Sequence, residues 1–167
     1  MHAIKEFIHA QLLPEELKQE LVGERVMKQH AMYLQLPYWL APLFAPVTPA
    51  QVEKLSISSY LYFRFLLVVD GQMDAAPTAV VPTSMEREVQ RLMVYCDLFE
   101  KSVRGLGDLF PLNDPFWAAL DRCKAQYAGA NVQEKMLSRA HRNFSREVFE
   151  QLATDKSAVC NAIVANG

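Results

Sequence analysis

The chain has 167 residues, a length that suits one domain with a real hydrophobic core. Apolar residues make up 51% of it and charged residues 22%, which excludes the disordered and fibrous classes. The formal net charge is −2, and the 17 Lys and Arg residues are spread along the chain, so we expect no nucleic-acid partner.

Membrane and secreted classes are also disfavoured. The longest apolar runs, 38–47 and 60–69, are too short to span a bilayer and are interrupted by Pro or Arg, so we expect no transmembrane segment. The N-terminus lacks the apolar stretch and cleavage site of a signal peptide. The cysteines are odd in number and widely spaced, without a Cys-x-x-Cys pair, which predicts reduced core thiols. Together these features predict a cytoplasmic protein.

Helix signals are frequent in the first half of the chain. Pro14, followed by two acids, opens a long helical pattern that Pro37 should kink or end. Residues 48–51, Thr-Pro-Ala-Gln, form a capping box with proline at the first helical position. This box predicts a central helix that runs to about Asp74, is apolar on nearly every side and is the most buried helix of the fold.

The second half continues the same way. A capping box at 83–86 predicts a helix to Gly105, and Asp114 followed by proline predicts another that ends near Gly129. From about 131 onward the pattern predicts one or two more helices, with a cap at 143–145. Strand alternation, hairpin dipeptides and internal repeats are absent. The predicted fold class is therefore all-α, a bundle of about six helices forming a single domain over 1–167.

Two acids end the central helix. Asp70 and Asp74 are four residues apart, which puts both carboxylates on one helix face, and Phe63 and Leu67 continue that face toward the core. Acids at a helix C-terminus oppose the helix dipole by about 0.3–1 kcal/mol each, so a compensating cation is expected. A Mg²⁺ ion that also holds a phosphate would compensate the two carboxylates. The alternative is that Gly71 ends the helix and leaves Asp74 as a solvated loop acid.

Two cations interrupt apolar segments. Lys156 lies within a helical stripe of apolar residues, where an ammonium must reach solvent along its stem or meet an anion such as a phosphate. Arg64 lies in the most apolar stretch of the chain and needs a partner if it is buried. A salt bridge from Arg64 to an acid of another helix is favoured over contact with a substrate.

Taken together, these residues resemble the class I isoprenoid synthase superfamily, which includes polyprenyl diphosphate synthases and terpene cyclases. In that family a central helix carries an Asp-Asp-x-x-Asp motif that binds Mg²⁺ and the substrate diphosphate. Asp70 and Asp74 match its first and third acids, and Gly71 takes the place of the second. The stretch 60–64 is similar to the aromatic lead-in of bacterial members, and 156–158, Lys-Ser-Ala, is similar to a Lys-Thr-Ala element whose lysine contacts diphosphate.

The resemblance implies a Mg²⁺-dependent enzyme that binds an allylic isoprenoid diphosphate and ionises it for prenyl transfer or cyclisation. It assigns Asp70, Asp74 and Lys156 as catalytic residues, the two aspartates as metal ligands, and Lys156 with Arg64 as diphosphate ligands. Because the two acids and Lys156 each break the apolar stripe of their own helix, we also expect Asp70, Asp74 and Lys156 to converge on one cavity around a shared anion and its metal. Chain length of the substrate, identity of the product and the choice between elongation and cyclisation do not follow from these residues.

The sequence departs from the family in two ways. The second metal motif of the family is missing, since Asn113-Asp114 is followed by Trp117 and Asp121 where the family has Ser/Thr and Glu. Family members are also much longer, so the chain resembles the front portion of the fold. We therefore expect it to form an oligomer or to be completed by another chain segment. The competing function is a non-catalytic helical module that binds a partner helix or an apolar ligand, with its charges solvated or paired.

Overall fold

The computed structural model describes residues 2–43, 46–74, 85–139 and 145–165, apart from the side chains of 73, 74, 139 and 160–165. Within these ranges all regular structure is helical, with eight α-helices and one short 3-10 helix, which confirms the all-α prediction. None of the described helices is both long and apolar enough to cross a membrane.

The described helices fall into two compact units, residues 1–109 and 110–167. The prediction of a single domain stays a prediction, and each unit is described by itself. The first unit contains the following elements: α1 (His2–His9), α2 (Glu15–Val22), α3 (Glu24–Gln29), α4 (Ala31–Leu40), η1 (Ala41–Leu43), α5 (Pro49–Asp74) and α6 (Met85–Gly107). The second contains α7 (Pro115–Arg139) and α8 (Arg146–Ala165).

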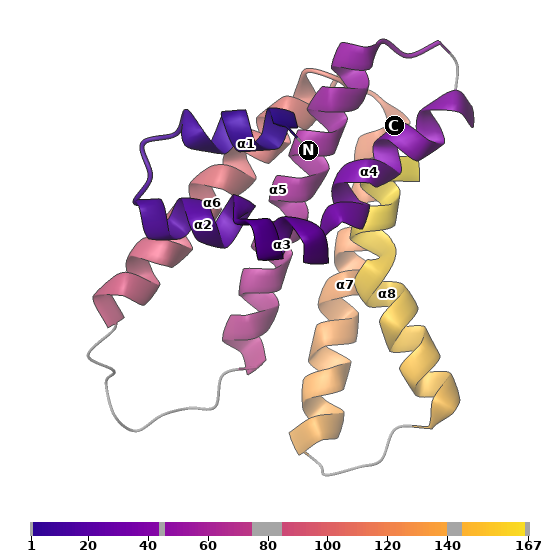
Figure 1. Cartoon of the computed structure of the whole chain (residues 1–167). Coiled ribbons are helices and arrows are strands. Elements are labelled where there is room, and N and C mark those ends of the chain that lie inside the picture. Colours follow the sequence, from indigo (N-terminus) through magenta and orange to yellow (C-terminus); the bar gives the residue numbers. More distant parts are fainter. Residues whose placement is uncertain (1, 44–45, 75–84, 140–144, 166–167) are drawn as a thin grey trace. The chain divides into compact units, whose positions relative to one another are not determined.

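In the first unit, α5 and α6 pack side by side and run antiparallel, and α4 packs against α5 (Figure 1). Helices α1 and α2 lie across α5 and α6 rather than along them (Figure 1). In the second unit, α7 and α8 form an antiparallel hairpin. More of the described buried residues belong to α5 than to any other helix, as predicted for the central helix.

The start of α5 is the predicted capping box. The Thr48 hydroxyl accepts a hydrogen bond from the Gln51 backbone N–H at 3.2 Å, and the Thr48 N–H donates to Gln51 Oε1 at 2.8 Å. Asp114 caps α7 in a similar way, since its Oδ1 accepts from the Phe116 N–H at 2.8 Å. Ser145 caps α8 through Val148. The capping box predicted at 83–86 cannot be followed, because Thr83 and Ser84 lie outside the described residues.

The prediction of one long helix between Pro14 and Pro37 is wrong, because the helix is interrupted at Gly23 and again at His30. Gly23 has an extended backbone, φ −59° and ψ 152°, and a Cβ there would lie 2.4 Å from the Gln19 carbonyl oxygen. Only glycine fits so close an approach. Pro37 neither ends nor interrupts its helix, which continues to Leu40. The predicted end near Gly129 is also wrong, since α7 runs on to Arg139.

These breaks and the proline leave carbonyl groups without helical donors, and α5 supplies donors to them. The Tyr60 hydroxyl donates to the Leu21 carbonyl at 2.6 Å, at the end of α2. In α4, proline has no N–H to give the Tyr33 carbonyl. The Ser59 hydroxyl lies 3.5 Å from this carbonyl, and its shorter hydrogen bond, 3.0 Å, goes to the Ser56 carbonyl of α5 itself. The neighbouring Leu34 carbonyl accepts from Ser56 at 2.7 Å.

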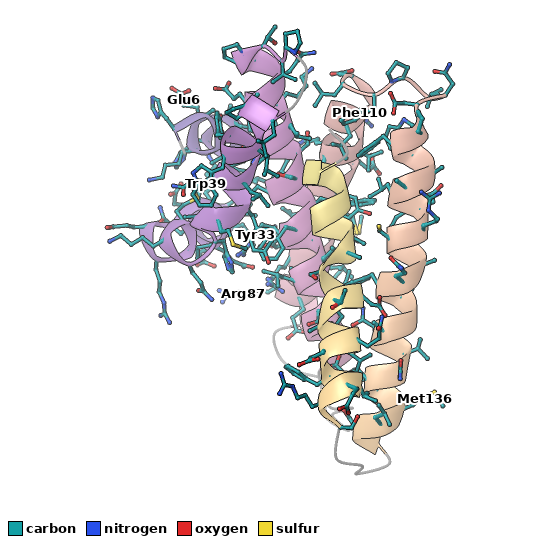
Figure 2. All side chains as sticks on the ribbon, turned by 90° about the vertical axis from the view of Figure 1, so that its right-hand side faces the viewer. Glu6, Tyr33, Trp39, Arg87, Phe110 and Met136 are labelled. Atoms are coloured by element: carbon teal, nitrogen blue, oxygen red, sulfur yellow. The ribbon has the colours of Figure 1, made fainter. Side chains whose placement is uncertain are left out.

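Apolar contacts complete this packing. The Tyr33 ring, labelled in Figure 2, stacks on Phe63 of α5 with ring centroids 3.5 Å apart. The core of the first unit draws on α1 to α6, with the following members fully or nearly fully buried: Ile4, Ile8, Leu21, Tyr60, Leu61, Tyr95 and Leu98. The short helices are therefore held by burial against α5 and α6 as well as by the hydrogen bonds from α5.

Removing the Tyr60 hydroxyl tests whether these bonds hold α2. We expect Tyr60→Phe to lower the free energy of unfolding by about 1–3 kcal/mol, because it leaves the Leu21 carbonyl buried without its donor. Chemical denaturation measures the change. The control is Tyr38→Phe, the same deletion on a half-exposed ring whose hydroxyl bonds Ser56, where water can replace it, so it should cost about 0.5–1 kcal/mol. Equal losses in the two variants would contradict the assignment.

Candidate functional site

The C-terminal end of α5 keeps the two acids on one face. The helix runs without a break through Gly71 to Asp74, so the alternative in which Gly71 ends the helix is wrong. Asp70 is half-buried, and the side chain of Asp74 lies outside the described part. A Cβ at Gly71 would meet no atom within 4 Å, so space does not require a glycine there. Position 71 could therefore carry the carboxylate that the family motif has.

The apolar face leading to the acids is only partly as predicted. Phe63 is buried, but Leu67, one turn before the acids, is 39% exposed. The predicted inward stripe is therefore right at Phe63 and wrong at Leu67. Of the chain's cysteines, Cys96 and Cys123 are free thiols and partly buried, and the side chain of Cys160 is not described.

Arg64 lies inside the first unit with 7% of its surface exposed. One terminal nitrogen donates to the Glu20 backbone carbonyl and to the Tyr95 hydroxyl, both at 3.0 Å. The Tyr95 hydroxyl donates in turn to Glu20 Oε1 at 2.8 Å, and Arg91 forms a salt bridge with the same carboxylate at 2.6 Å. Arg64 Nε has no hydrogen-bond partner in this arrangement. Arg64 thus bonds to Glu20 of another helix through the backbone carbonyl, and reaches its carboxylate only through Tyr95, rather than by the direct salt bridge that the sequence predicted.

The charges of this cluster shift its titration. Burial alone would raise the pKa of Glu20, but hydrogen bonds from Arg91 and Tyr95 and the charges of Arg91 and Arg64 outweigh it, so the pKa lies below its ordinary value. Burial raises the pKa of Tyr95, and it raises that of Tyr60 to about 12. Both phenols are therefore neutral donors at physiological pH, as their hydrogen bonds require.

The sequence did not single out Glu20, Arg91 or Tyr95. One signal was present, because Arg91 and Tyr95 are four residues apart and share a face of α6. Glu20 could not be paired with them in advance, since the contact depends on how α2 lies across α6.

Lys156 has an acid partner in its own unit. Its ammonium lies 2.8 Å from Glu134 Oε2 on α7, and the side chain is 24% exposed. The predicted apolar stripe around Lys156 is buried at Leu152 and Val159. It is exposed at Phe149. The sequence left open whether Lys156 reaches solvent or meets an anion, and it did not identify Glu134, because that pairing needs the register of the α7–α8 hairpin.

The proposed ligands belong to different units. Asp70 and Arg64 lie in the first unit and Lys156 in the second, so their convergence on one cavity stays a prediction. Among the described residues no cluster of three or more His, Cys, Asp or Glu could hold a metal. Two carboxylates still suit Mg²⁺, which keeps several waters and needs only one or two protein carboxylates when it also binds phosphate.

Comparison with known proteins gives no match: no family model, no curated protein and no solved structure is similar to this chain.

The lowered pKa of Glu20 predicts a pH-dependent loss in Glu20→Gln. The ionised carboxylate stabilises the fold above its unfolded-state value near 4.5, and this contribution disappears as the pH falls through the lower folded-state pKa. We expect the variant to lose about 1.5–3 kcal/mol of unfolding free energy at pH 7, and progressively less below pH 4.5. Urea denaturation from pH 7 to pH 3 gives the curve.

Glu16→Gln, an exposed acid on the same helix, is the control, and its effect should stay small throughout. A loss in Glu20→Gln that is the same at both ends of the pH range would show that the carboxylate charge does not contribute.

Proposed function

We propose that this chain is a Mg²⁺-dependent, class I isoprenoid synthase-like protein that binds an allylic isoprenoid diphosphate and ionises it for prenyl transfer or cyclisation. The observation that supports this proposal most is the continuity of α5 through Gly71. It leaves Asp70 and Asp74 one turn apart on one face at the end of the most buried helix.

The physical argument rests on charge. Two acids at a helix C-terminus meet the negative end of the helix dipole and repel each other. Asp70 is also half-buried, which weakens its hydration. A divalent cation bound across the two carboxylates would remove each of these costs, and oxygen ligands of this kind suit Mg²⁺.

The proposed chemistry breaks the bond between the allylic carbon and the diphosphate oxygen. The bonding electron pair leaves with the diphosphate, and the carbon fragment becomes an allylic cation. Bound Mg²⁺ would neutralise charge on the departing diphosphate. Asp70 and Asp74 would hold the Mg²⁺, and Lys156 would donate hydrogen bonds to the leaving oxygens after exchanging Glu134 for them.

Under this proposal Arg64 holds helices together rather than the diphosphate. One of its terminal nitrogens is already committed to Glu20 and Tyr95 inside the first unit. The proposal therefore keeps Lys156 as the diphosphate ligand and leaves Arg64 out of that role.

Gly71 offers a gain-of-function test. Because a side chain at this position would meet no neighbouring atom, Gly71→Asp should be accommodated and should add the carboxylate that the family motif carries. We expect it to tighten Mg²⁺-dependent binding of inorganic diphosphate and geranyl diphosphate at least tenfold, about 1.4 kcal/mol. Asp70→Asn should weaken this binding at least tenfold. Titration calorimetry with and without Mg²⁺ measures both effects.

Gly71→Ala is the matched control, since it adds a Cβ and stabilises the helix by about 0.5–1 kcal/mol without adding charge. It should leave diphosphate affinity unchanged. The proposal fails if neither the wild type nor Gly71→Asp binds diphosphate in Mg²⁺, or if Gly71→Ala tightens binding as much as Gly71→Asp does.

The second candidate is a non-catalytic helical module that binds a partner helix or an apolar ligand. The observation that favours it is the ion pair between Lys156 and Glu134, which gives the lysine an anion without any ligand. The two candidates differ in what Lys156→Gln does. The enzyme proposal predicts weaker diphosphate binding, whereas the module predicts a small loss of stability, about 1 kcal/mol or less, with no diphosphate binding to lose.

A further inference from the structure

Helix α4 is apolar on its outer side as well as on the side that packs against α5. All of its residues except Gln35 are apolar or aromatic. Leu34 and Pro37 are buried. Met32 and Trp39, the latter labelled in Figure 2, are 52% and 58% exposed. A helix at a protein surface normally carries polar residues on its outer side, so α4 does not have the sequence of a helix that faces only water.

The exposed surface continues past the end of α4. Trp39 follows Met32 by seven residues and Leu43 of η1 follows Trp39 by four, a helical spacing that puts the three on one side. Leu43 is 76% exposed. Beside them, a hollow of about 440 Å³ is lined by Tyr38 and otherwise by apolar residues of η1, of the loop before α5 and of the first turn of α5. We call the surface formed by Met32, Tyr38, Trp39 and Leu43 the apolar face.

This part of the sequence is uncharged. Residues 29–52 contain no Asp, Glu, Lys or Arg. Their one histidine, His30, has a pKa below its ordinary value because it is partly buried and lies near the charge of Arg64. It is therefore mainly neutral at pH 7. An occupant of the apolar face thus meets apolar and neutral polar groups and no ionised side chain from this segment.

These features favour a lipid surface over a second protein as the occupant. A protein–protein interface normally has a rim of polar and charged residues around its apolar centre, whereas charges are costly in a bilayer. Tryptophan and tyrosine gather where hydrocarbon meets water, because each ring is apolar and carries one polar group. Trp39 and Tyr38 are adjacent on the apolar face. The prolines at 42, 46 and 49 have no N–H to leave unbonded in a medium poor in water.

We propose that the apolar face of α4 docks on the surface of a phospholipid bilayer. At 1.5 Å per residue α4 is about 15 Å long, half the hydrocarbon thickness of about 30 Å, so it lies along the surface. Met32, Trp39 and Leu43 insert between the lipids, and part of an acyl chain occupies the hollow beside Tyr38. Docking needs neither Mg²⁺ nor the acids at the end of α5, so it can be tested separately from the proposed function.

Trp39 itself reports on the docking, because the chain has only two tryptophans, Trp39 and Trp117. In Trp117→Phe, vesicles of phosphatidylcholine should shift the fluorescence of Trp39 to shorter wavelengths, and brominated acyl chains should quench it. In Trp39→Phe, the remaining Trp117 should show neither change. Trp117 donates a hydrogen bond to the Phe110 carbonyl in the second unit, outside the apolar face.

Cosedimentation of the whole chain with the same vesicles measures affinity. Trp39→Gln should weaken binding at least about tenfold and Met32→Gln about threefold, because each removes apolar area that leaves water on docking. Val89→Gln is the matched control, since Val89 lies on a helix of the same unit and is 54% exposed, close to the value for Met32. It should change affinity by less than about twofold. Asp70→Asn should bind vesicles like the wild type.

Binding should not depend on anionic lipid. The cations that flank residues 29–52 in the sequence already form ion pairs, Lys28 with Glu24 and Lys54 with Asp108. Replacing about a third of the phosphatidylcholine by phosphatidylserine should therefore change affinity by less than about threefold.

The proposal is overturned if the wild type does not sediment with phosphatidylcholine vesicles, if binding requires phosphatidylserine, or if Val89→Gln weakens binding as much as Met32→Gln does. It is also overturned if light scattering shows an oligomer that Trp39→Gln converts to a monomer, because a second copy would then be the occupant of the apolar face.

Discussion

Helix α5 must satisfy polar groups inside a core, and this requirement organises the first unit. The helix is buried over much of its length, yet it carries serine hydroxyls, a tyrosine and an arginine that cannot be left without partners. The neighbouring helices have the opposite need, because the break at Gly23 and the proline of α4 leave carbonyls without helical donors. Side chains of α5 therefore donate hydrogen bonds to backbone carbonyls of α2 and α4.

This pairing fixes α2 and α4 against α5. Tyr60 and Arg64 bond to the last turn of α2, and Ser56 bonds to α4 beside its proline. A short helix such as α2 is marginal alone, so these bonds and the burial around them decide where it lies. Arg64 therefore holds α5 against α2 and α6 through one terminal nitrogen, while its Nε has no hydrogen-bond partner, and the proposed metal ligands lie about two to three turns further along the same helix.

The fold class, the capping box of α5 and the caps of α7 and α8 could be predicted because each depends on neighbours in the sequence. The division of 14–37 into three helices could not, because the apolar spacing continues past Gly23 and His30, and the cost of each break is offset by contacts with α5. For the same reason Glu134 and Glu20 were not identified as partners of the two cations. The placement of the acids on one face was predicted from spacing, and it depended on α5 passing through Gly71, which spacing alone left open.

The central claim, that the acids ending α5 hold a divalent cation together with a diphosphate, can be tested with Mn²⁺ in place of Mg²⁺. Mn²⁺ is paramagnetic and broadens the NMR signals of nuclei near its binding site. In the presence of inorganic diphosphate, substoichiometric Mn²⁺ should selectively broaden the backbone amides around Asp70 and Asp74, and Asp70→Asn should abolish this effect. Broadening that is uniform along the chain, or centred away from the end of α5, would contradict the account.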